Sequence, residues 1–255
     1  MSRRIVSLVP SLTEILFAVG AGESVVGVTR FCTDPPEGVA GLPAVGGTKN
    51  PDLAAIAVLA PDLVVMNAEE NRREDFEALT AAGLEILVTD PRTVDEGVAL
   101  IARLAEAAGA GARGRALAAA QGAAVARVRA RVRDRRPVRY FCPIWRKPWM
   151  TFNADTYAHD LLRVAGGENV AAARADRYPV VELDEIAAAA PEVVLLPDEP
   201  YRFQERDLPA LAPLAGTPAL AAGRVHLVDG KALAWYGPRI GAGVAAFAAL
   251  LAAAR

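Results

Sequence analysis

The chain has 255 residues, 53% of them hydrophobic, and its 28 basic and 30 acidic side chains give a formal net charge of −2. This length and apolar content are enough to bury one large core or two medium ones. The near balance of charge excludes a strong overall electrostatic field that would attract nucleic acid or an anionic membrane. We therefore expect no nucleic-acid partner.

The N-terminal segment has the composition of a signal peptide, with two arginines before an apolar run, but Glu14 interrupts that run. A charge is poorly tolerated there. We therefore predict a strand followed by a helix, with Ser11 and Glu14 forming a capping box. The apolar stretch Gly241–Ala254 is short for a bilayer span. We expect no export signal in this chain.

The first half alternates apolar runs with amphipathic segments, which is typical of a parallel α/β sheet. The predicted strands are Ile5–Leu8, Val25–Val28, Leu63–Met66 and Glu85–Val88. The predicted helices are Leu12–Val19, Asp52–Leu59, Asn71–Ala82 and Val94–Ala108.

Residues 112–134 contain no proline and are rich in alanine and arginine, which favours one uninterrupted helix. About 22 residues at about 1.5 Å each span about 33 Å, the width of a small domain. We expect this helix to join two lobes rigidly. The arginines between Arg127 and Arg136 are interpreted as its solvated face, because valines recur at helical spacing among them.

The second half returns to the same alternation. Its predicted elements are a strand at Val138–Cys142, a helix at Thr156–Ala165 that ends at Gly166 and Gly167, a strand at Val225–Val228, and a C-terminal helix after Pro238.

One pattern occurs twice. Residues 52–67 read DLAAIAVLAPDLVVMN, and residues 182–197 read ELDEIAAAAPEVVLLP. In each copy a proline stops a short helix and an apolar run follows, as in a strand buried on both faces. We predict two similar α/β lobes with parallel central sheets, joined by the long helix, with a ligand cleft between them. The expected boundaries are 1–110 for the N-terminal lobe, 111–136 for the connecting helix and 137–255 for the C-terminal lobe.

Further motifs, in their order, resemble the helical-backbone (class III) periplasmic substrate-binding proteins, and within them the cobalamin-binding proteins of vitamin B12 uptake. These motifs are SLVPSLTEILFAVGAGESVVGVT (7–29), DPP (34–36), VGG and PDL (45–53), LLRVAGGENV (161–170), YPVVELDEI (178–186) and WYGPRIG (235–241). The resemblance implies non-enzymatic corrinoid binding for an ABC-type importer, with cobalamin as the transported ligand and no built-in cofactor. It also implies a monomer in the periplasm or cell envelope. A cytoplasmic location is the alternative, because no export signal is expected.

Loops after the carboxyl ends of parallel strands line the ligand sites of α/β sheets. On the first lobe this rule nominates Ser11, Phe31, Thr48, Asn67 and Glu69. On the second lobe it nominates Trp145, Trp149, Met150, Tyr178, Trp235 and Tyr236. Aromatic rings cover a large planar corrin with few rotors to immobilise. The alternative for the first two tryptophans is a role as buried loop anchors.

In the family that the chain resembles, one acidic residue on each lobe docks onto arginines of the permease. The second-lobe position matches Asp184, with Glu185 adjacent, whereas the first-lobe position matches Ala54. Asp52 lies two residues earlier, on another part of the helix. The sequence therefore leaves open whether this chain has a permease partner.

Other classes of site have weaker support. The two cysteines, Cys32 and Cys142, have no zinc spacing and are expected to be free. Two histidines, His159 and His226, are few for a bare metal ion or for catalysis, so we predict no metal ligand and no catalytic residue.

Three alternatives remain. A haem carrier would use Tyr178 or Tyr236 as an axial ligand. An iron–siderophore carrier would use basic side chains of the cleft loops, which are Arg30, Lys49, Arg146 and Lys147. An enzyme acting on a small molecule bound in the cleft would have Glu69 and Glu70 as its local carboxylates.

Overall fold

The computed structural model describes residues 3–255, and its contacts divide the chain into two compact units. The first unit comprises the residues up to 91, residues 95–121 and residues 236–238. The second comprises residues 92–94, 122–235 and 239–255. Helix α6 (Gly111–Val132) supplies residues to both units. The separate status of residues 111–136 as a connecting segment stays a prediction.

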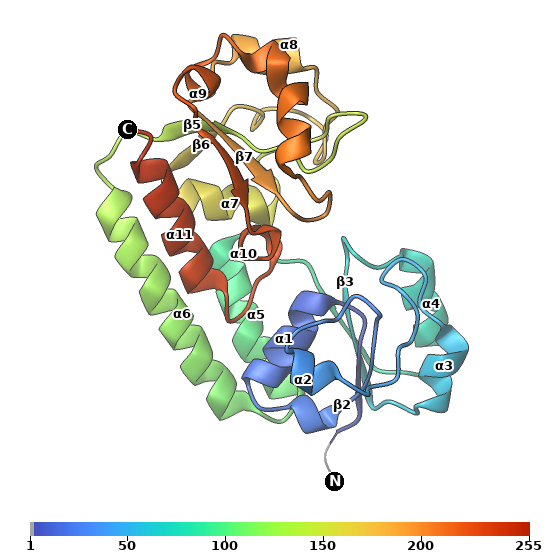
Figure 1. Ribbon diagram of the computed structural model, residues 1–255. Helices are drawn as coiled ribbons and strands as arrows, with labels where there is room; N and C mark the ends of the chain where they lie inside the picture. The colour runs from blue at the N-terminus through green and yellow to red at the C-terminus, as the bar shows by residue number, and fades with distance from the viewer. Residues whose placement is uncertain (1–2) are drawn as a thin grey trace. The chain divides into compact units, whose positions relative to one another are not determined.

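The first unit is built on a four-stranded parallel sheet in the order β2-β1-β3-β4. Figure 1 labels two of these strands, β2 and β3. Its strands are β1 (Ile5–Ser7), β2 (Val25–Val28), β3 (Leu63–Asn67) and β4 (Ile86–Thr89). Its helices are α1 (Pro10–Ala18), the 3₁₀ turn η1 (Gly22–Ser24), α2 (Pro36–Val39), α3 (Leu53–Val58), α4 (Arg73–Ala81) and α5 (Val94–Ala107).

Strand β3 is buried on both faces, as its continuous apolar run predicts. Alternate residues such as Val64 and Met66 pack with Ile56 of α3 and Leu79 of α4 in one core cluster. The intervening residues, Leu63 and Val65, are also fully buried, and they belong to the opposite face of the sheet. Helices on both faces thus fix the carboxyl edge of the sheet, where the candidate site lies.

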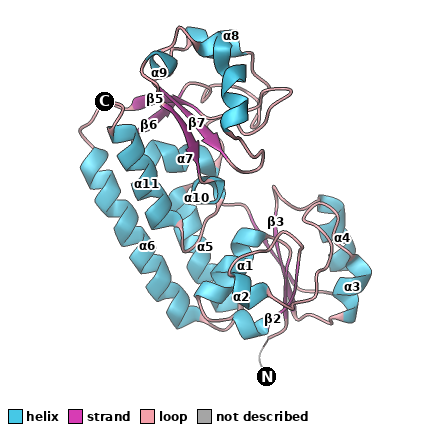
Figure 2. Ribbon diagram, in the orientation of Figure 1, coloured by secondary structure: helices cyan, strands magenta, loops and turns pink. Residues whose placement is uncertain are grey.

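The second unit repeats this architecture with a parallel sheet in the order β6-β5-β7-β8. Figure 2 shows helices flanking its strands. The strands are β5 (Val138–Phe141), β6 (Gly167–Asn169), β7 (Val193–Pro197) and β8 (Val225–Val228). The helices are α7 (Tyr157–Val164), α8 (Leu183–Ala188), the 3₁₀ helix η2 (Glu205–Leu214), α9 (Pro218–Ala221), α10 (Gly230–Ala234) and α11 (Ile240–Ala252).

The two copies of the repeated pattern fold alike. Each forms a six-residue helix followed by a five-residue strand, α3 with β3 and α8 with β7. The acidic residue after the proline plays the same part in both copies. The Asp62 carboxylate accepts a hydrogen bond of 2.7 Å from the Arg4 amide, and the Glu192 carboxylate accepts one of 3.0 Å from the Arg139 amide. Each carboxylate therefore satisfies a backbone donor beside the neighbouring strand.

One local prediction was wrong. Helix α1 begins at Pro10 with Val9 as its N-cap, so Ser11 lies inside the helix and forms no capping box. Proline at the first helical position starts the helix because its missing N–H needs no partner there. The helix predicted at Thr156–Ala165 is confirmed as α7, whose caps are Thr156 and Ala165. Strand β6, which begins at Gly167, was not predicted.

The two cysteines are free, and both are buried. Within residues 3–255, no helix is both long and apolar enough to cross a membrane.

Candidate functional site

In the first unit, Asn67 at the carboxyl end of β3 organises the loop that follows. Its side-chain oxygen accepts hydrogen bonds from the amides of Glu69 (2.9 Å) and Glu70 (3.2 Å). The backbone N–H of Asn67 donates to Asn71 Oδ1 at 2.8 Å. The Asn71 side chain in turn donates to the carbonyl of Thr48 at 2.9 Å. Two asparagines thus hold the loops after β2 and β3 together.

Tyr236 is part of the first unit, although the sequence nominated it for the second lobe. Its hydroxyl accepts a hydrogen bond of 2.7 Å from Asn67 Nδ2, and only 6% of the residue is exposed. Burial, followed by the negative charge of Glu70, raises the pKa of the Tyr236 phenol above its ordinary value. The next residue, Gly237, has a φ of 116°, and a Cβ there would lie 2.5 Å from Ile15 Cγ1. This close approach admits only glycine and fixes the backbone beside Tyr236.

Phe31 is the exposed aromatic residue of the first unit. Its ring is 51% exposed, and the guanidinium of Arg30 lies 5.0 Å from the ring centroid. Ser11, by contrast, is 2% exposed. The first unit therefore offers a ligand one apolar ring and a polar loop, and Ser11 lies beneath that surface.

In the second unit, the loop after β5 presents an aromatic surface. Trp145 is 43% exposed and meets Tyr201 edge to face, with ring centroids 5.6 Å apart. Backbone bridges join Met150 to Trp145 on one side and to Val180, which is 52% exposed, on the other. These bridges place Trp145, Met150 and Val180 side by side, and we call these three residues with Tyr201 the aromatic surface. The sequence analysis did not nominate Val180, although it lies within the motif at 178–186, or Tyr201, which lies in no such motif.

Trp149 is partly buried and packs against the core of the second unit. Its ring stacks on Phe203 with centroids 6.0 Å apart and an interplanar angle of 5°, and it packs against the core cluster of Phe141 and Leu196. The alternative interpretation of Trp149 as a loop anchor agrees with this packing. Tyr178, two residues before Val180, is 39% exposed.

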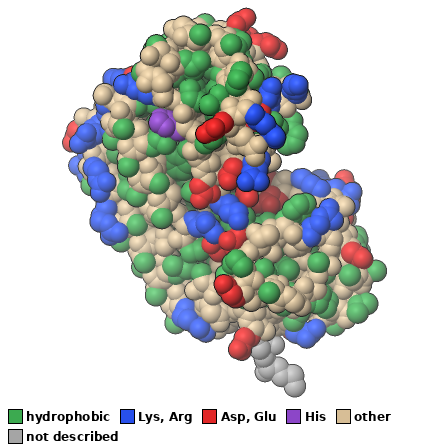
Figure 3. Space-filling model, in the orientation of Figure 1, with side chains coloured by type: hydrophobic (Ala, Val, Ile, Leu, Met, Phe, Trp, Pro, Cys, Tyr) green, Lys and Arg blue, Asp and Glu red, His purple; other side chains and the backbone are tan. Residues whose placement is uncertain are grey.

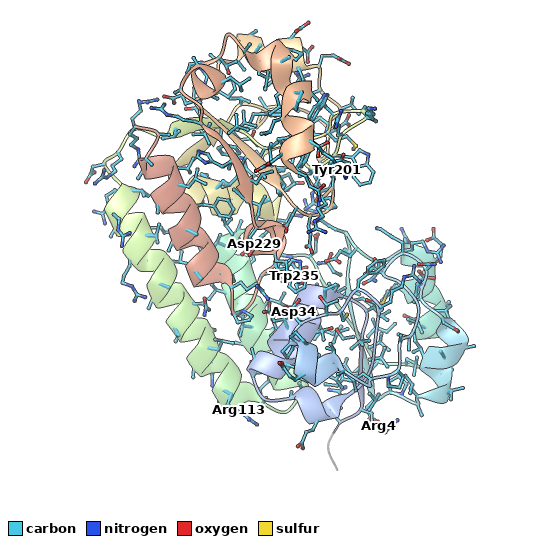
Figure 4. The ribbon with its side chains drawn as sticks, in the orientation of Figure 1. Arg4, Asp34, Arg113, Tyr201, Asp229 and Trp235 are labelled. Carbon is cyan, nitrogen blue, oxygen red and sulfur yellow. The ribbon has the colours of Figure 1, made fainter. Side chains whose placement is uncertain are left out.

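Trp235 is buried between charged groups at the end of α10, near Asp229 (Figure 4). Its indole N–H donates to Glu199 at 3.2 Å, while Lys231 and Arg239 lie 4.8 and 5.4 Å from its ring centroid. Burial raises the pKa of the Glu199 carboxyl, although Lys231 and the indole N–H oppose the shift. Two cationic side chains thus lie over this ring, and the cation–π contacts and the indole hydrogen bond together hold its orientation.

A hollow of about 470 Å³ lies beside this cluster in the second unit. Its polar lining residues include Asp198, Arg202 and Asp229, and Phe203 and Leu227 are among its apolar ones. The Asp198 carboxylate accepts from the Gly230 amide at 2.7 Å, so one of its oxygens already serves the backbone.

Several basic side chains that would favour an anionic iron complex already have partners. Arg146 forms an ion pair with the buried carboxylate of Asp207. Although burial opposes it, hydrogen bonds from the Gln204 amide and Arg146 hold the pKa of that carboxyl below its ordinary value. Lys49 donates to the Glu69 carbonyl at 2.6 Å.

The two residues nominated for docking lie in the first turn of α8, and both are exposed. Glu185 pairs with Arg174 at 2.6 Å. In the equivalent helix α3, the Asp52 side chain accepts from the Ala55 amide at 3.0 Å and caps the helix. The two copies of the repeat therefore present different charges to solvent.

Residues 3–255 contain no group of three or more His, Cys, Asp or Glu side chains that could hold a metal ion. Cys32 is 5% exposed, and its sulfur lies 3.2 Å from the hydroxyls of Thr13 and Thr29. Burial raises the pKa of this thiol despite those two hydroxyls. Cys32 is therefore not presented as a metal ligand.

Each unit is thus a parallel α/β sheet with an exposed aromatic residue in a loop that follows its strands, Phe31 in the first and Trp145 in the second. The sequence profile described as "Periplasmic binding protein" matches residues 5–232, and the chain belongs to this family. This confirms the resemblance drawn from the ordered motifs. Members of the family bind and do not transform their substrates.

Three relatives illustrate the range of the family. The chain is 27% identical over 214 residues to the vitamin B12-binding protein of Vibrio parahaemolyticus, covering 82% of this chain and 78% of the relative. The periplasmic vitamin B12 binding protein BtuF of Vibrio cholerae superposes with a TM-score of 0.88 at 24% identity, over 99% of this chain and 98% of its own, and this similarity shows the fold alone. The periplasmic heme-binding protein RhuT from Roseiflexus sp. RS-1 in apo form also reaches 0.88, at 30% identity, over 100% and 99%.

Proposed function

We propose that this chain binds a corrinoid, with cobalamin as its ligand, in the periplasm or cell envelope, and delivers it to an ABC-type importer. The observation that carries the proposal is the aromatic surface of the second unit, where Trp145 is 43% exposed and Val180 is 52% exposed. Exposed contiguous apolar side chains mark ligand or partner sites. Within the first unit, the exposed aromatic side chain is Phe31, at 51%.

A corrinoid suits the groups that are available. It carries its own axial ligands to cobalt and needs apolar cover and hydrogen bonds from the protein. Tyr236 is a poor axial ligand, because its hydroxyl is buried and bonded to Asn67. The vitamin B12-binding relative from Vibrio parahaemolyticus supports the same choice.

Haem is the second candidate, and Tyr178 is the observation that favours it. This tyrosine is 39% exposed, and a tyrosinate is a known axial ligand of haem iron. The similarity to the heme-binding protein RhuT also supports this candidate.

Absorbance titrations of the purified protein with cyanocobalamin and with haemin test the choice. We expect a saturable change with cyanocobalamin at one ligand per chain, weakened about tenfold in Trp145→Ala and unchanged in Tyr178→Phe. A Soret shift with haemin that Tyr178→Phe abolishes, without any response to cyanocobalamin, would assign the protein to haem.

We propose no catalytic role for the site. Cobalamin recovered from the complex after long incubation should be chemically unchanged by chromatography and mass spectrometry. Turnover of the bound compound would instead identify an enzyme built on the binding-protein fold.

We also propose that the chain works as a monomer and docks on the importer through the exposed acidic turn of α8. The double variant Asp184→Arg, Glu185→Arg should abolish stimulation of ATP hydrolysis by the reconstituted importer and leave ligand affinity unchanged. Equal stimulation by wild type and variant would exclude this turn from the docking surface.

A further inference from the structure

We propose that the arginine-rich end of α6, together with the adjoining C-terminus, contacts the surface of an anionic phospholipid bilayer. We call these residues the arginine surface; its members are Arg127, Arg131, Arg133, Arg135, Arg136 and Arg255. The inference rests on the proposed function in one respect only. The proposed location in the periplasm or cell envelope is what brings the protein close to a membrane.

The arginine surface is a local exception to the charge of the chain. Residues 127–136 read RVRARVRDRR, with six arginines and one aspartate, whereas the whole chain has a net charge of −2. All ten residues belong to the second unit. Figure 3 shows basic side chains along the edge of this unit that α6 forms.

Most of these guanidinium groups have no acidic partner. Arg136 pairs with Glu192 at 2.7 Å. Among the described residues 3–255, no ion pair involves Arg127, Arg131, Arg133 or Arg135. Four of the guanidinium charges are therefore available to an external anion.

Helix α6 presents two of these charges, Arg127 and Arg131, away from its buried side. Val125 and Val128 are buried against the unit, while Ala123, Ala126 and Ala130 form an exposed ridge on the opposite side. At about 100° per residue, the arginines at 127 and 131 lie beside that ridge. The alanine side chains of this ridge project little from the helix. The longer arginine side chains on either side extend beyond them and can reach a flat anionic layer.

The C-terminal arginine extends the cluster. Arg255 Nε donates to the carbonyl of Arg136 at 3.0 Å, and Arg135 Nε donates to the carbonyl of Arg131 at 3.2 Å. Burial, with the charges of Arg135 and Arg136, lowers the pKa of the Arg255 guanidinium. Like charges are thus held close together, and an anionic surface would relieve their repulsion.

A bilayer fits this surface better than a nucleic acid. Single-stranded nucleic acids are held by aromatic side chains interleaved with basic ones, and residues 112–136 contain no Phe, Trp or Tyr. Each basic residue close to an anionic leaflet changes the partition coefficient about fivefold, which is equivalent to about 1 kcal/mol. Four unpaired arginines are enough for measurable, salt-sensitive association.

Flotation of the full chain with vesicles tests the proposal. The vesicles contain either phosphatidylglycerol mixed with phosphatidylcholine or phosphatidylcholine alone, each at low and at high salt. The test variant is Arg127→Gln, Arg131→Gln. The matched control is Arg202→Gln, Arg206→Gln, which removes two exposed, unpaired charges elsewhere in the same unit. Each protein is also titrated with cyanocobalamin and with a duplex oligonucleotide.

We expect binding to the anionic vesicles alone, lost at high salt, weakened about 25-fold in the test variant and clearly less in the control. Cobalamin affinity should be the same in the wild type and the test variant. The cobalamin titration therefore tests the proposed ligand, and the vesicle assay tests membrane binding, independently of each other. The proposal is overturned by absence of vesicle binding at low salt, by equal loss in both variants, or by tighter binding of the duplex than of vesicles.

Discussion

The side-chain amide of Asn67 donates a hydrogen bond of 2.7 Å to the hydroxyl of Tyr236, a residue 169 positions further along the chain. Both groups are buried. The same amide nitrogen also lies 3.2 Å from the Thr89 hydroxyl at the end of β4. The bond therefore ties residues 236–238 to the carboxyl edge of the first sheet, where the candidate site lies.

Replacement of Tyr236 by phenylalanine should destabilise the first unit. The change leaves a buried donor of Asn67 with one acceptor fewer, which costs about 1–2 kcal/mol. Urea unfolding followed by circular dichroism measures the loss. The control is Tyr178→Phe, whose ring is exposed and whose midpoint should move little. Equal midpoints for both variants would mean that the bond contributes nothing to stability.

Substitutions of the two tryptophans in the loop after β5 should have different effects, one on stability and the other on ligand binding. Trp149→Ala removes a ring stacked on Phe203 and should lower the unfolding free energy by about 2 kcal/mol. Trp145→Ala removes an exposed ring, so it should cost less than about 1 kcal/mol but weaken cobalamin binding about tenfold. Thermal unfolding and ligand titration of both variants check this. The reverse assignment of the two effects would show that Trp149 is the ligand contact.

The Glu192 carboxylate should make stability depend on pH in the acid range. Hydrogen bonding to Arg136 is the main cause that lowers the pKa of Glu192 from 4.5 to about 2. Because the folded-state pKa is depressed, the stabilisation is complete above about pH 4.5 and is lost as pH falls towards about 2.

Glu192→Gln should therefore cost about 1–2 kcal/mol near pH 7, after allowance for solvent screening, and less near pH 3. The matched control is Glu168→Gln, because Glu168 lies 3.7 Å from Arg139 and is more exposed. Urea unfolding at the two pH values measures how much each substitution lowers the unfolding free energy. A cost for Glu192→Gln that is independent of pH would point to lost packing and not to the charge.

Neither cysteine should react in the folded protein. Burial raises the pKa of both thiols, and the sulfur of Cys32 also contacts two threonine hydroxyls. The thiolate is the reactive form. A disulfide exchange reagent should therefore label both thiols only after unfolding in denaturant. Rapid labelling of one thiol in the native protein would reveal local opening around it.

Much of the fold follows from the sequence, because the apolar runs and the prolines carry strong local signals. The strands Val25–Val28 and Val225–Val228 have the predicted bounds, and the repeat at residues 52–67 and 182–197 predicts two similar units. Strand β6 could not be predicted in this way. Its three residues, Gly167–Asn169, have no strand propensity, and the strand exists because β5 supplies its hydrogen-bonding partners.

The candidate site is less accessible to sequence reasoning. Loop position nominates Phe31 and Trp145, whose exposure agrees with a role in binding. The same rule nominates Ser11, which is buried, and Trp149, which is partly buried, and in both cases packing from distant elements decides this. The Arg146–Asp207 pair and the Asn67–Tyr236 bond join residues far apart in the chain, and no local pattern announces either contact.

The most direct test of the account is isothermal titration of the purified full chain with cyanocobalamin, with haemin titrated in parallel. We predict one-to-one binding of cyanocobalamin with a Kd that is micromolar or tighter, which corresponds to a binding free energy of about −8 kcal/mol or better. Absence of heat and of any spectral change with cyanocobalamin, together with saturable binding of haemin, would contradict it.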